Sequence, residues 1–364
     1  MAIFIKLDEL MKEKGYTLSR LADEIGITVA NLSNFKTGKI SEIRLSTLER
    51  ICEILGCQPG DLVEYRKLEK KKIIPLFLDY SGTSDLLLKG GAENVKKFFD
   101  SIIEMQRKSN CEVQITMVTG SAFESAKSKY KLLYELANNY ELPDLFVGAV
   151  AEYCGFLISK DGYISLLPLD TRILDKQRDI SAIAEKYGGA INPDVTSMYN
   201  VLFDEISRTD LAKFSEEIDE LINDEEIETI TYYDDYGKEC DIKPKIHSKS
   251  EVVYMLVKKL RETAEFPFVI IGGDSQEEDL KMYTSNKERF EEMGLGTVFI
   301  APANIGELTA TDKNIIVGKW ENADGITDCI KGLTSRMRVN EDGGIEIWKR
   351  YVLFSNMIAR SSWI

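Results

Sequence analysis

The sequence of 364 residues contains a single histidine, His247, and six cysteines that form no C-x-x-C pair. Zinc sites built from cysteine and histidine are therefore disfavoured, as are histidine-dependent catalytic dyads and triads, unless His247 alone serves. No apolar run approaches the roughly 18 residues that a membrane span requires, and the start, MAIFIKLDELMKEKG, lacks the pattern of a signal peptide. We expect a cytoplasmic protein with free thiols and no membrane partner.

The charge is unevenly divided along the chain. The formal net charge is −15, which is unusual for a protein that binds nucleic acid. Residues 1–72, however, hold 13 lysines and arginines against 11 acidic residues, whereas the rest of the chain holds 33 against 50. Phosphates repel the acidic part, so any contact with DNA is expected to be confined to the N-terminal part.

Residues 6–63 show the pattern of a series of short helices. Thr17 and Thr28 are suitable N-caps for helices at Leu18–Ile25 and Val29–Thr37, and Gly26 suits the tight turn between them. Apolar residues occur where two crossed helices must touch: Leu21, Ala22, Ile25, Ile27 and Leu32. This part of the chain is therefore predicted to be an all-α domain with a helix-turn-helix.

The segment LSRLADEIGITVANLSNFKTGKI resembles the Cro and lambda-repressor (Xre-like) family of DNA-binding domains, over about residues 3–65. The resemblance implies that Thr28 begins the recognition helix, that asparagines after it read adenine edges and that small apolar side chains meet thymine methyl groups. The residues implied are Val29, Ala30, Asn31 and Asn34 for bases, and Lys36, Lys39 and Arg44 for phosphates. The expected partner is an operator in double-stranded DNA, bound by a homodimer because the domain is only modestly basic. A helical domain that binds protein is the alternative.

Beyond the first domain, short apolar strands alternate with helices, which predicts a doubly wound α/β sheet. A further alternation of helices and strands inside it suggests an inserted α/β cap. The charged segment YRKLEKKK is expected to be a linker, either solvated only or also in contact with DNA phosphates. The expected division is 1–64 (helix-turn-helix), 65–72 (linker), 73–161 with 244–335 (core), 162–243 (cap) and 336–364 (tail).

Four separated segments place a polar side chain after a predicted strand or at the start of a helix. Asp79 follows the strand Ile73–Leu78, and Thr119 follows Val113–Val118. Lys249 opens a helix in DIKPKIHSKSEVV, and Asp274 follows the strand in FVIIGGDSQEED. Sheets of this class bind ligands at the carboxyl ends of their strands, so these side chains are candidates for one site.

The order and spacing of the four segments resemble the haloacid-dehalogenase phosphatases over about residues 72–335, in their capped, Cof-like or sugar-phosphatase-like branches. The resemblance implies a phosphorylated small molecule as ligand and Mg²⁺ as cofactor, held by hard oxygen ligands. Asp79 would be both nucleophile and metal ligand, with Thr119 and Lys249 on the phosphoryl oxygens. The remaining implied metal ligands are the carbonyl of Ser81, Asp274, and Glu278 or Asp279.

One position departs from that family's pattern. Its phosphatases carry a second aspartate two residues after the nucleophile, which protonates the leaving group, and here Ser81 stands there. A serine cannot replace a general acid that typically contributes about 10²–10⁴-fold. A slow phosphatase, a phosphoryl-transfer switch and a binding-only sensor all remain open.

The tail, GIEIWKRYVLFSNMIARSSWI, could place Ile347, Tyr351, Phe354 and Met357 on one helical face, either covering the core or forming a dimer contact. For the whole chain, the preferred hypothesis is a ligand-responsive transcription regulator that binds or slowly hydrolyses a phosphorylated metabolite. The alternatives are an active phosphohydrolase localised by its DNA-binding domain, and an autoregulated antitoxin or phage-defence interaction protein.

Overall fold

The computed structural model describes residues 3–37, 42–65, 70–81, 83, 91–233, 238–306, 308, 312–340 and 345–347. The chain divides into two compact units, Met1–Lys70 and Lys71–Ile364, and each is treated by itself. None of the helices in the described ranges combines the length and apolar character that a membrane crossing requires.

The first unit is a small helical bundle closed by a short sheet. Its helices are α1 (Leu7–Lys14), α2 (Leu18–Ile25), α3 (Val29–Lys36), α4 (Leu45–Leu55) and α5 (Pro59–Leu62), and β1 (Ile3–Ile5) pairs antiparallel with β2 (Val63–Tyr65). Leu21, Ala22, Ile25 and Leu32 are buried together, as the sequence predicts. Gly26 ends α2 with φ of 83°, a left-handed conformation that glycine adopts without steric cost.

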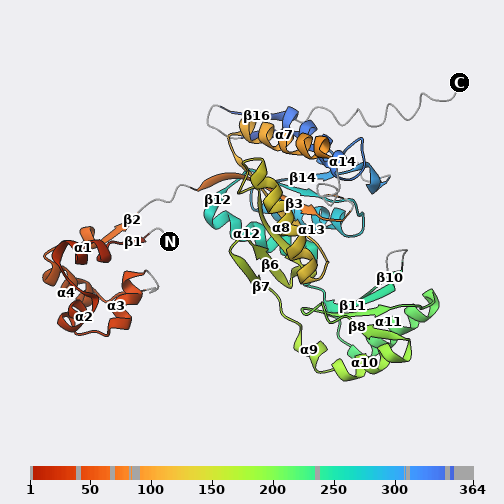
Figure 1. Ribbon diagram of the computed structural model, residues 1–364, viewed down its shortest axis with the longest axis horizontal. Coiled ribbons are helices and arrows are strands. Elements are labelled where there is room, and N and C mark those ends of the chain that lie inside the picture. The colour runs from red at the N-terminus through yellow and green to blue at the C-terminus, as the bar shows by residue number, and fades with distance from the viewer. Residues whose placement is uncertain are drawn as a thin grey trace. The chain divides into compact units, whose positions relative to one another are not determined.

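The second unit is built on a mostly parallel sheet (Figure 1). Its strand order is β15 (Ile315–Val317), β14 (Gly296–Ala301), β13 (Phe268–Gly272), β3 (Lys71–Asp79), β4 (Glu112–Val118), β5 (Phe146–Ala151), β6 (Phe156–Ser159) and β7 (Gly162–Ser165). The strands from β15 to β5 are parallel, and β5, β6 and β7 form antiparallel pairs. The short β12 (Ala264–Glu265) pairs with the start of β3. The chain thus passes to opposite sides of β3, which creates a topological switch point between β3 and β13.

Helices cover both faces of this sheet. Alternate residues of β3 enter two separate cores, with Ile74, Leu76 and Leu78 in one and Ile73 and Phe77 in the other. The first core is shared with α7 (Ala92–Ser109), α8 (Phe123–Asn139) and α14 (Asn322–Arg336), and the second with α12 (Lys249–Thr263) and α13 (Asp279–Glu292). The fold class predicted from the sequence, an all-α domain followed by a doubly wound α/β domain with an inserted cap, is confirmed by this arrangement.

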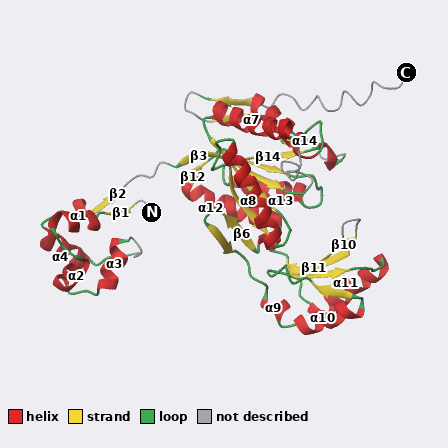
Figure 2. Cartoon of the chain, in the orientation of Figure 1, coloured by secondary structure: helices red, strands yellow, loops and turns green. Residues whose placement is uncertain are grey.

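The inserted cap has a sheet and a core of its own (Figure 2). Its antiparallel strand order is β10 (Ile227–Tyr233), β11 (Lys238–Pro244), β9 (Tyr199–Phe203) and β8 (Gly189–Ile191). Its helices are α9 (Thr171–Leu174), α10 (Gln177–Lys186) and α11 (Arg208–Ile222). Phe214, Ile218 and Val201 pack in the cap core, apart from the two cores of the main sheet.

Two expected boundaries and the expected helix in the tail need correction. Lys71 and Lys72, expected in the linker, already belong to β3 because they pair with β12. Residues 162–165, expected in the cap, form β7 and pair with β6 in the main sheet. The segment around Ile347 is not a helix: β16 (Met337–Val339) and β17 (Ile345–Ile347) form an antiparallel pair packed on the first core of the main sheet. Tyr351, Phe354 and Met357 lie outside the described residues.

Candidate functional site

The recognition-helix candidate, α3, presents the polar side chains that the sequence predicts. Thr28 caps the helix, its hydroxyl accepting a hydrogen bond from the backbone N–H of Asn31 at 3.2 Å. Leu32 and Phe35 face the core. Thr28, Val29, Ala30, Asn31 and Asn34 are all exposed, so their side chains are accessible to a duplex.

The three basic residues predicted to hold phosphates differ from one another. Lys36 forms an ion pair with Asp8 at 3.0 Å, so this amine is already partly neutralised within the domain. Arg44 is exposed at the start of α4. Lys39 lies outside the described residues. A phosphate would therefore have to compete for Lys36 with Asp8, which lies 28 residues earlier in the chain.

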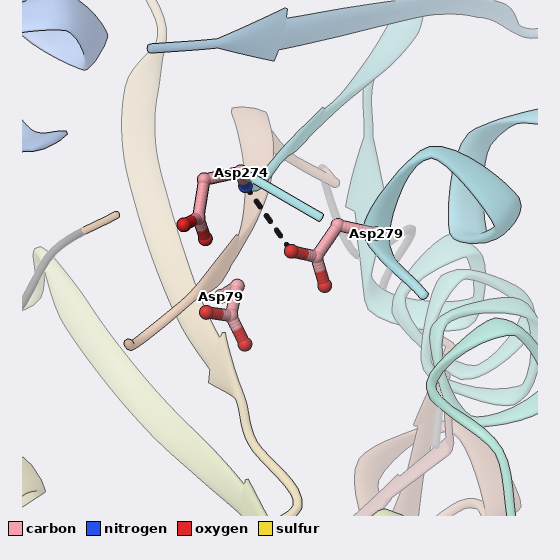
Figure 3. Close-up of side chains that lie close together, drawn as sticks. All are labelled: Asp79, Asp274 and Asp279. Atoms are coloured by element: carbon pink, nitrogen blue, oxygen red, sulfur yellow. Dashed lines mark hydrogen bonds between the residues drawn. The ribbon is translucent and has the colours of Figure 1, made fainter. Parts of the chain in front are cut away.

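At the carboxyl edge of the main sheet, three aspartates meet (Figure 3). Asp79 ends β3, Asp274 follows the adjacent β13, and Asp279 begins α13. One ligand oxygen of each lies within 4.8 Å of the others. Burial raises the pKa of Asp79 to about 7, although Lys249 opposes this rise, and burial also raises the pKa of Asp274.

Lys249 connects the carboxylates. Ser248 caps α12, which places Lys249 in its first turn with the side chain buried. The Lys249 Nζ lies 2.7 Å from Asp79 Oδ1, 2.8 Å from Asp279 Oδ1 and 3.0 Å from Glu278 Oε2. Burial alone would lower the pKa of this amine, but the three carboxylates outweigh burial and raise it well above its ordinary value, so the amine stays protonated.

The oxygens of Asp279 are engaged inside the site. Oδ1 accepts from Lys249, and Oδ2 accepts from the backbone N–H groups of Asp274 and Ser275, each at 3.1 Å. Asp279 thereby holds the loop that carries Asp274. The carboxylate of Asp274 accepts hydrogen bonds from Thr83 Oγ1 at 3.0 Å and Asn304 Nδ2 at 2.9 Å. Each carboxylate oxygen has two lone pairs, so both oxygens of Asp274 can accept a further ligand.

Mg²⁺ fits this donor set, because Asp79 and Asp274 provide hard carboxylate oxygens at one place and the site is strongly acidic. Glu278 is less suited to a direct ligand, since Oε2 contacts Lys249 and Oε1 accepts from Tyr153 OH at 3.0 Å. Burial would raise the pKa of Glu278, but Lys249 lowers it overall, so this side chain remains a carboxylate.

Thr119 and Ser81 also reach the site. Thr119 is buried at the end of β4, beside β3, and its hydroxyl bonds Ser121 Oγ at 3.0 Å. Ser81 is exposed and lines a cavity together with Asp79 and Thr119, so there is room for the side chain of a general acid where this serine stands. The structure thus brings together Asp79, Ser81, Thr119, Lys249, Asp274, Glu278 and Asp279, all of which the sequence singles out.

Tyr153 is a site residue that sequence reasoning missed. It lies in a turn where Glu152, Tyr153 and Cys154 all have positive φ, at 49°, 47° and 102°. Such conformations are costly for residues other than glycine and cluster at functional sites. The Tyr153 ring packs so closely on Gly120 that a β-carbon there would clash, and its hydroxyl lies 3.0 Å from Tyr232 OH of the cap.

The buried carboxylate of Glu152 holds this turn. It accepts hydrogen bonds from the backbone N–H groups of Phe123 at 3.1 Å, Thr196 at 3.1 Å and Ser197 at 2.8 Å. These bonds join the end of β5 to the start of α8 and to the cap. No sequence signal marks the turn, because its partners are distant along the chain.

The site opens into a cavity of about 870 Å³ between the main sheet and the cap. Asp79, Thr119, Lys249 and Asp274 line its core side. Cap residues line the other side, among them Asn192, Met198, Asn200, Glu239 and Asp241. This volume is in the range of pockets that bind small organic molecules.

The first unit matches known proteins in sequence. A family model described as a Cro/C1-type helix-turn-helix DNA-binding domain matches residues 6–67. A Bacillus subtilis (strain 168) relative, named an uncharacterized HTH-type transcriptional regulator, YozG, is 51% identical over 69 residues. That match covers 19% of this chain and 82% of the relative.

The second unit has likenesses among solved structures. A Thermoplasma acidophilum protein, 0175, is similar over 72% of this chain and 97% of its own, with 14% identity and a TM-score of 0.45. The sucrose-phosphatase of Synechocystis sp. PCC6803, solved with sucrose and phosphate, is similar over 72% of this chain and 98% of its own, with 15% identity and a TM-score of 0.45. A phosphatase of the haloalkanoate (HAD) superfamily from Bacteroides thetaiotaomicron gives 72% and 95% coverage, 13% identity and a TM-score of 0.44.

Proposed function

Since the chain belongs, through residues 6–67, to the Cro/C1-type helix-turn-helix DNA-binding family, we propose that it is a DNA-binding regulator whose α/β unit responds to a phosphorylated small molecule bound with Mg²⁺. The observation that carries the second half of this proposal is the contact of Lys249 with Asp79 and Asp279, at 2.7 and 2.8 Å, beside Asp274. A cation beside a carboxylate pair with the donor atoms that Mg²⁺ prefers, at one switch point, is suited to a phosphoryl group.

Each side chain has a proposed task. Asp79, Asp274 and the backbone carbonyl of Ser81 would hold Mg²⁺, which would neutralise part of the phosphoryl charge. Lys249 would contact the phosphoryl oxygens from the opposite side, and the Thr119 hydroxyl would donate a hydrogen bond to them. Glu278 and Asp279 would position Lys249, because both already contact its amine.

For the DNA-binding half, α3 would enter the major groove, with Asn31 and Asn34 at adenine edges and Val29 and Ala30 at thymine methyl groups. Arg44, Lys39 and Lys36 would contact phosphates, with Lys36 weakened by its pairing to Asp8. One domain offers few contacts, so binding is proposed to require a homodimer on two half-sites. Light scattering on the full chain would measure this state, and a monomer that binds an operator tightly would contradict it.

A slow phosphohydrolase is the second candidate, because the proposed nucleophile and its lysine are in place. In that reaction an Asp79 oxygen would form a bond to phosphorus while the bond from phosphorus to the ester oxygen breaks. Water would then attack the phosphorus, which breaks the bond to Asp79 and releases phosphate. The departing oxygen needs a proton, and the Ser81 hydroxyl is too weak an acid to supply it. Esters with good leaving groups, such as aryl phosphates, would then react far faster than alkyl phosphates.

The test uses the full chain and beryllium fluoride as a phosphoryl mimic. We expect thermal stabilisation by the mimic only when Mg²⁺ is present, and its loss in Asp79→Asn and Lys249→Ala. A change in the DNA affinity of the full chain on adding beryllium fluoride with Mg²⁺ would support the proposed ligand-responsive regulator. DNA affinity that is unchanged, together with turnover of an aryl phosphate that far exceeds turnover of an alkyl phosphate, would favour the phosphohydrolase. No stabilisation under any condition would refute ligand binding at this site.

A further inference from the structure

The cap side of the cavity carries a connected polar network whose purpose the phosphoryl site does not explain. Asn200 lies on β9 and is buried, and Asp241 lies opposite it on β11, only 3% exposed. Asn192, before β9, and Glu239, on β11, complete the network, which we call the cap cluster. All four side chains line the same cavity as Asp79 and Lys249.

The atoms of the cap cluster that remain open to a ligand are carboxylate oxygens. Asn200 Nδ2 donates to Asp241 Oδ1 at 2.7 Å and to Glu239 Oε2 at 3.1 Å, which uses both of its hydrogens. Asn200 Oδ1 is occupied as well, because it accepts from Asn192 Nδ2 at 2.8 Å. Within the described residues, Asp241 Oδ2 has no hydrogen-bond partner. In their ionised form the two carboxylates therefore offer acceptors to the cavity, where a donor on a ligand would reach them.

The charges around the cavity indicate which kind of donor group the cap cluster favours. Among the described residues that line the cavity, Lys249 is the one lysine or arginine, and three carboxylates on the core side already contact it. Neither Glu239 nor Asp241 has an ion pair within the described residues; Lys243, on the same strand as Asp241, acts to lower the pKa of Asp241 but is itself paired with Glu228 at 2.5 Å. Burial raises the pKa of Asp241 to about 7, and the negative charge of Glu239 adds to this rise. A positive charge beside the two side chains would stabilise their ionised forms and so offset the rise in the pKa of Asp241.

From these observations we propose that the cap cluster binds a protonated amino group, so that the ligand is a phosphate monoester of an amino alcohol or amino sugar. This inference rests on the proposed function, since the phosphate occupies the site formed by Asp79 and Lys249. The ammonium donates charge-assisted hydrogen bonds to Asp241 and Glu239. A second anionic group on the ligand, such as a carboxylate or another phosphate, is disfavoured by the same two side chains.

The cavity has room for such a molecule. A volume of about 870 Å³ accommodates a monosaccharide phosphate. The aliphatic side chains of Val195 and Met198 line it beside the cap cluster, which gives the carbon skeleton an apolar surface to pack on. One end of the ligand thus meets the main sheet and the other end meets the cap.

The test compares esters that differ only at the amino group, using calorimetry on the full chain with Mg²⁺ near pH 7. Glucosamine 6-phosphate is paired with glucose 6-phosphate, and phosphoethanolamine with ethylene glycol monophosphate. We expect the amine of at least one pair to bind about 10-fold or more tightly than its hydroxyl analogue, as one charge-assisted hydrogen bond allows. Equal binding within both pairs, or preference for the hydroxyl, would overturn the proposal.

Variants separate the cap cluster from the phosphoryl site. Asp241→Asn and Glu239→Gln should each abolish the preference for the amine, while stabilisation by beryllium fluoride with Mg²⁺ is retained. Asp204→Asn is the matched control, because Asp204 is an exposed acid of the same cap that does not line the cavity. If the mimic binds but no ester does, the amine proposal fails alone. If the mimic does not bind, the proposed function fails and the amine proposal with it.

Discussion

Replacing Lys249 with methionine tests the electrostatics of the proposed phosphoryl site directly. The Lys249 amine lies within 3.0 Å of oxygens of Asp79, Glu278 and Asp279. The side chains of Lys249, Asp79 and Asp279 are 8%, 7% and 1% exposed, so solvent screens these pairs little. Removing one partner of a buried ion pair costs about 3–5 kcal/mol, because the remaining charge is left uncompensated. We expect a loss of this size at pH 7.5 with EDTA present.

The loss should be smaller in acid. Burial raises the pKa of Asp79 to about 7, above its ordinary value of 3.8, so the folded protein binds this proton more tightly than the unfolded chain. Stability from this group is therefore present in acid and is lost as the pH rises toward about 7. Without Lys249 the folded pKa rises further, and the cost of the substitution should be about 1 kcal/mol smaller at pH 5.5 than at pH 7.5.

The assay is denaturant unfolding of the second unit, followed by circular dichroism at both pH values, with and without Mg²⁺. Mg²⁺ should recover part of the loss in Lys249→Met, since it supplies positive charge at the same carboxylates. Lys243→Met is the control: this lysine is equally buried, but its carboxylate partner is Glu228 of the cap. A loss below about 1 kcal/mol, or the same loss at both pH values and in Mg²⁺, would refute the account of a buried, charged cluster.

Three further predictions concern other parts of the chain. Asn31→Ala should weaken binding to a selected operator by about 1–3 kcal/mol and leave random DNA unaffected, as measured by fluorescence anisotropy; equal losses would exclude base reading. Ser81→Asp should raise alkyl phosphate hydrolysis by about 10-fold or more. Ser81→Asn, whose side chain has the same shape as the introduced aspartate, should not, because an amide has no acidic proton. Burial lowers the pKa of His247 to about 4, and its Nδ1 has no partner among the described residues. The unfolded chain therefore binds this proton first as the pH falls below about 6.5, and between pH 7 and pH 4.5 the wild type should lose about 2 kcal/mol more than His247→Gln. Parallel stability curves for the two proteins would contradict that prediction.

The sequence predicted the main sheet well, because its strands are short apolar segments with local signals. Ile73 to Leu78 carries no charge, and it forms most of β3. Parallel neighbouring strands end at the same edge, so the placement of Asp79, Thr119 and Asp274 at three strand ends was sufficient to predict that they meet. Lys249 was found from its position at the start of a helix, which the Ser248 cap fixes locally.

The features that escaped prediction depend on distant parts of the chain. The left-handed turn at Tyr153 is imposed by contacts to Phe123 and Ser197, not by its own residue types. The cap cluster depends on the register of two antiparallel strands, which places Asn200 opposite Asp241. A shift of one strand by one residue would turn its side chain to the other face and separate the pair, and a single sequence does not fix that register.

Tyr153 connects the strained turn to the predicted site, so a substitution of Tyr153 tests whether the turn affects ligand binding. Its hydroxyl contacts Glu278 at 3.0 Å, and Glu278 contacts Lys249 at 3.0 Å, so the tyrosine is a positioning residue for the lysine. Tyr153→Phe keeps the ring on Gly120 and removes only the hydroxyl. We expect affinity for beryllium fluoride with Mg²⁺ to fall by about 10-fold, corresponding to one hydrogen bond to a charged group.

The matched control for that experiment is Tyr187→Phe, because Tyr187 lies in the cap, donates to Glu217 at 2.7 Å and does not line the cavity. Both substitutions remove a tyrosine hydroxyl from a glutamate, so both should lower thermal stability slightly. Only Tyr153→Phe should change affinity for the mimic, since only Tyr153 reaches a carboxylate that contacts Lys249. If affinity is unchanged in both variants, the strained turn positions nothing at the site. If affinity for the mimic falls equally in both variants, the loss reflects a general decrease in stability, and the proposed positioning of Lys249 by Tyr153 through Glu278 is wrong.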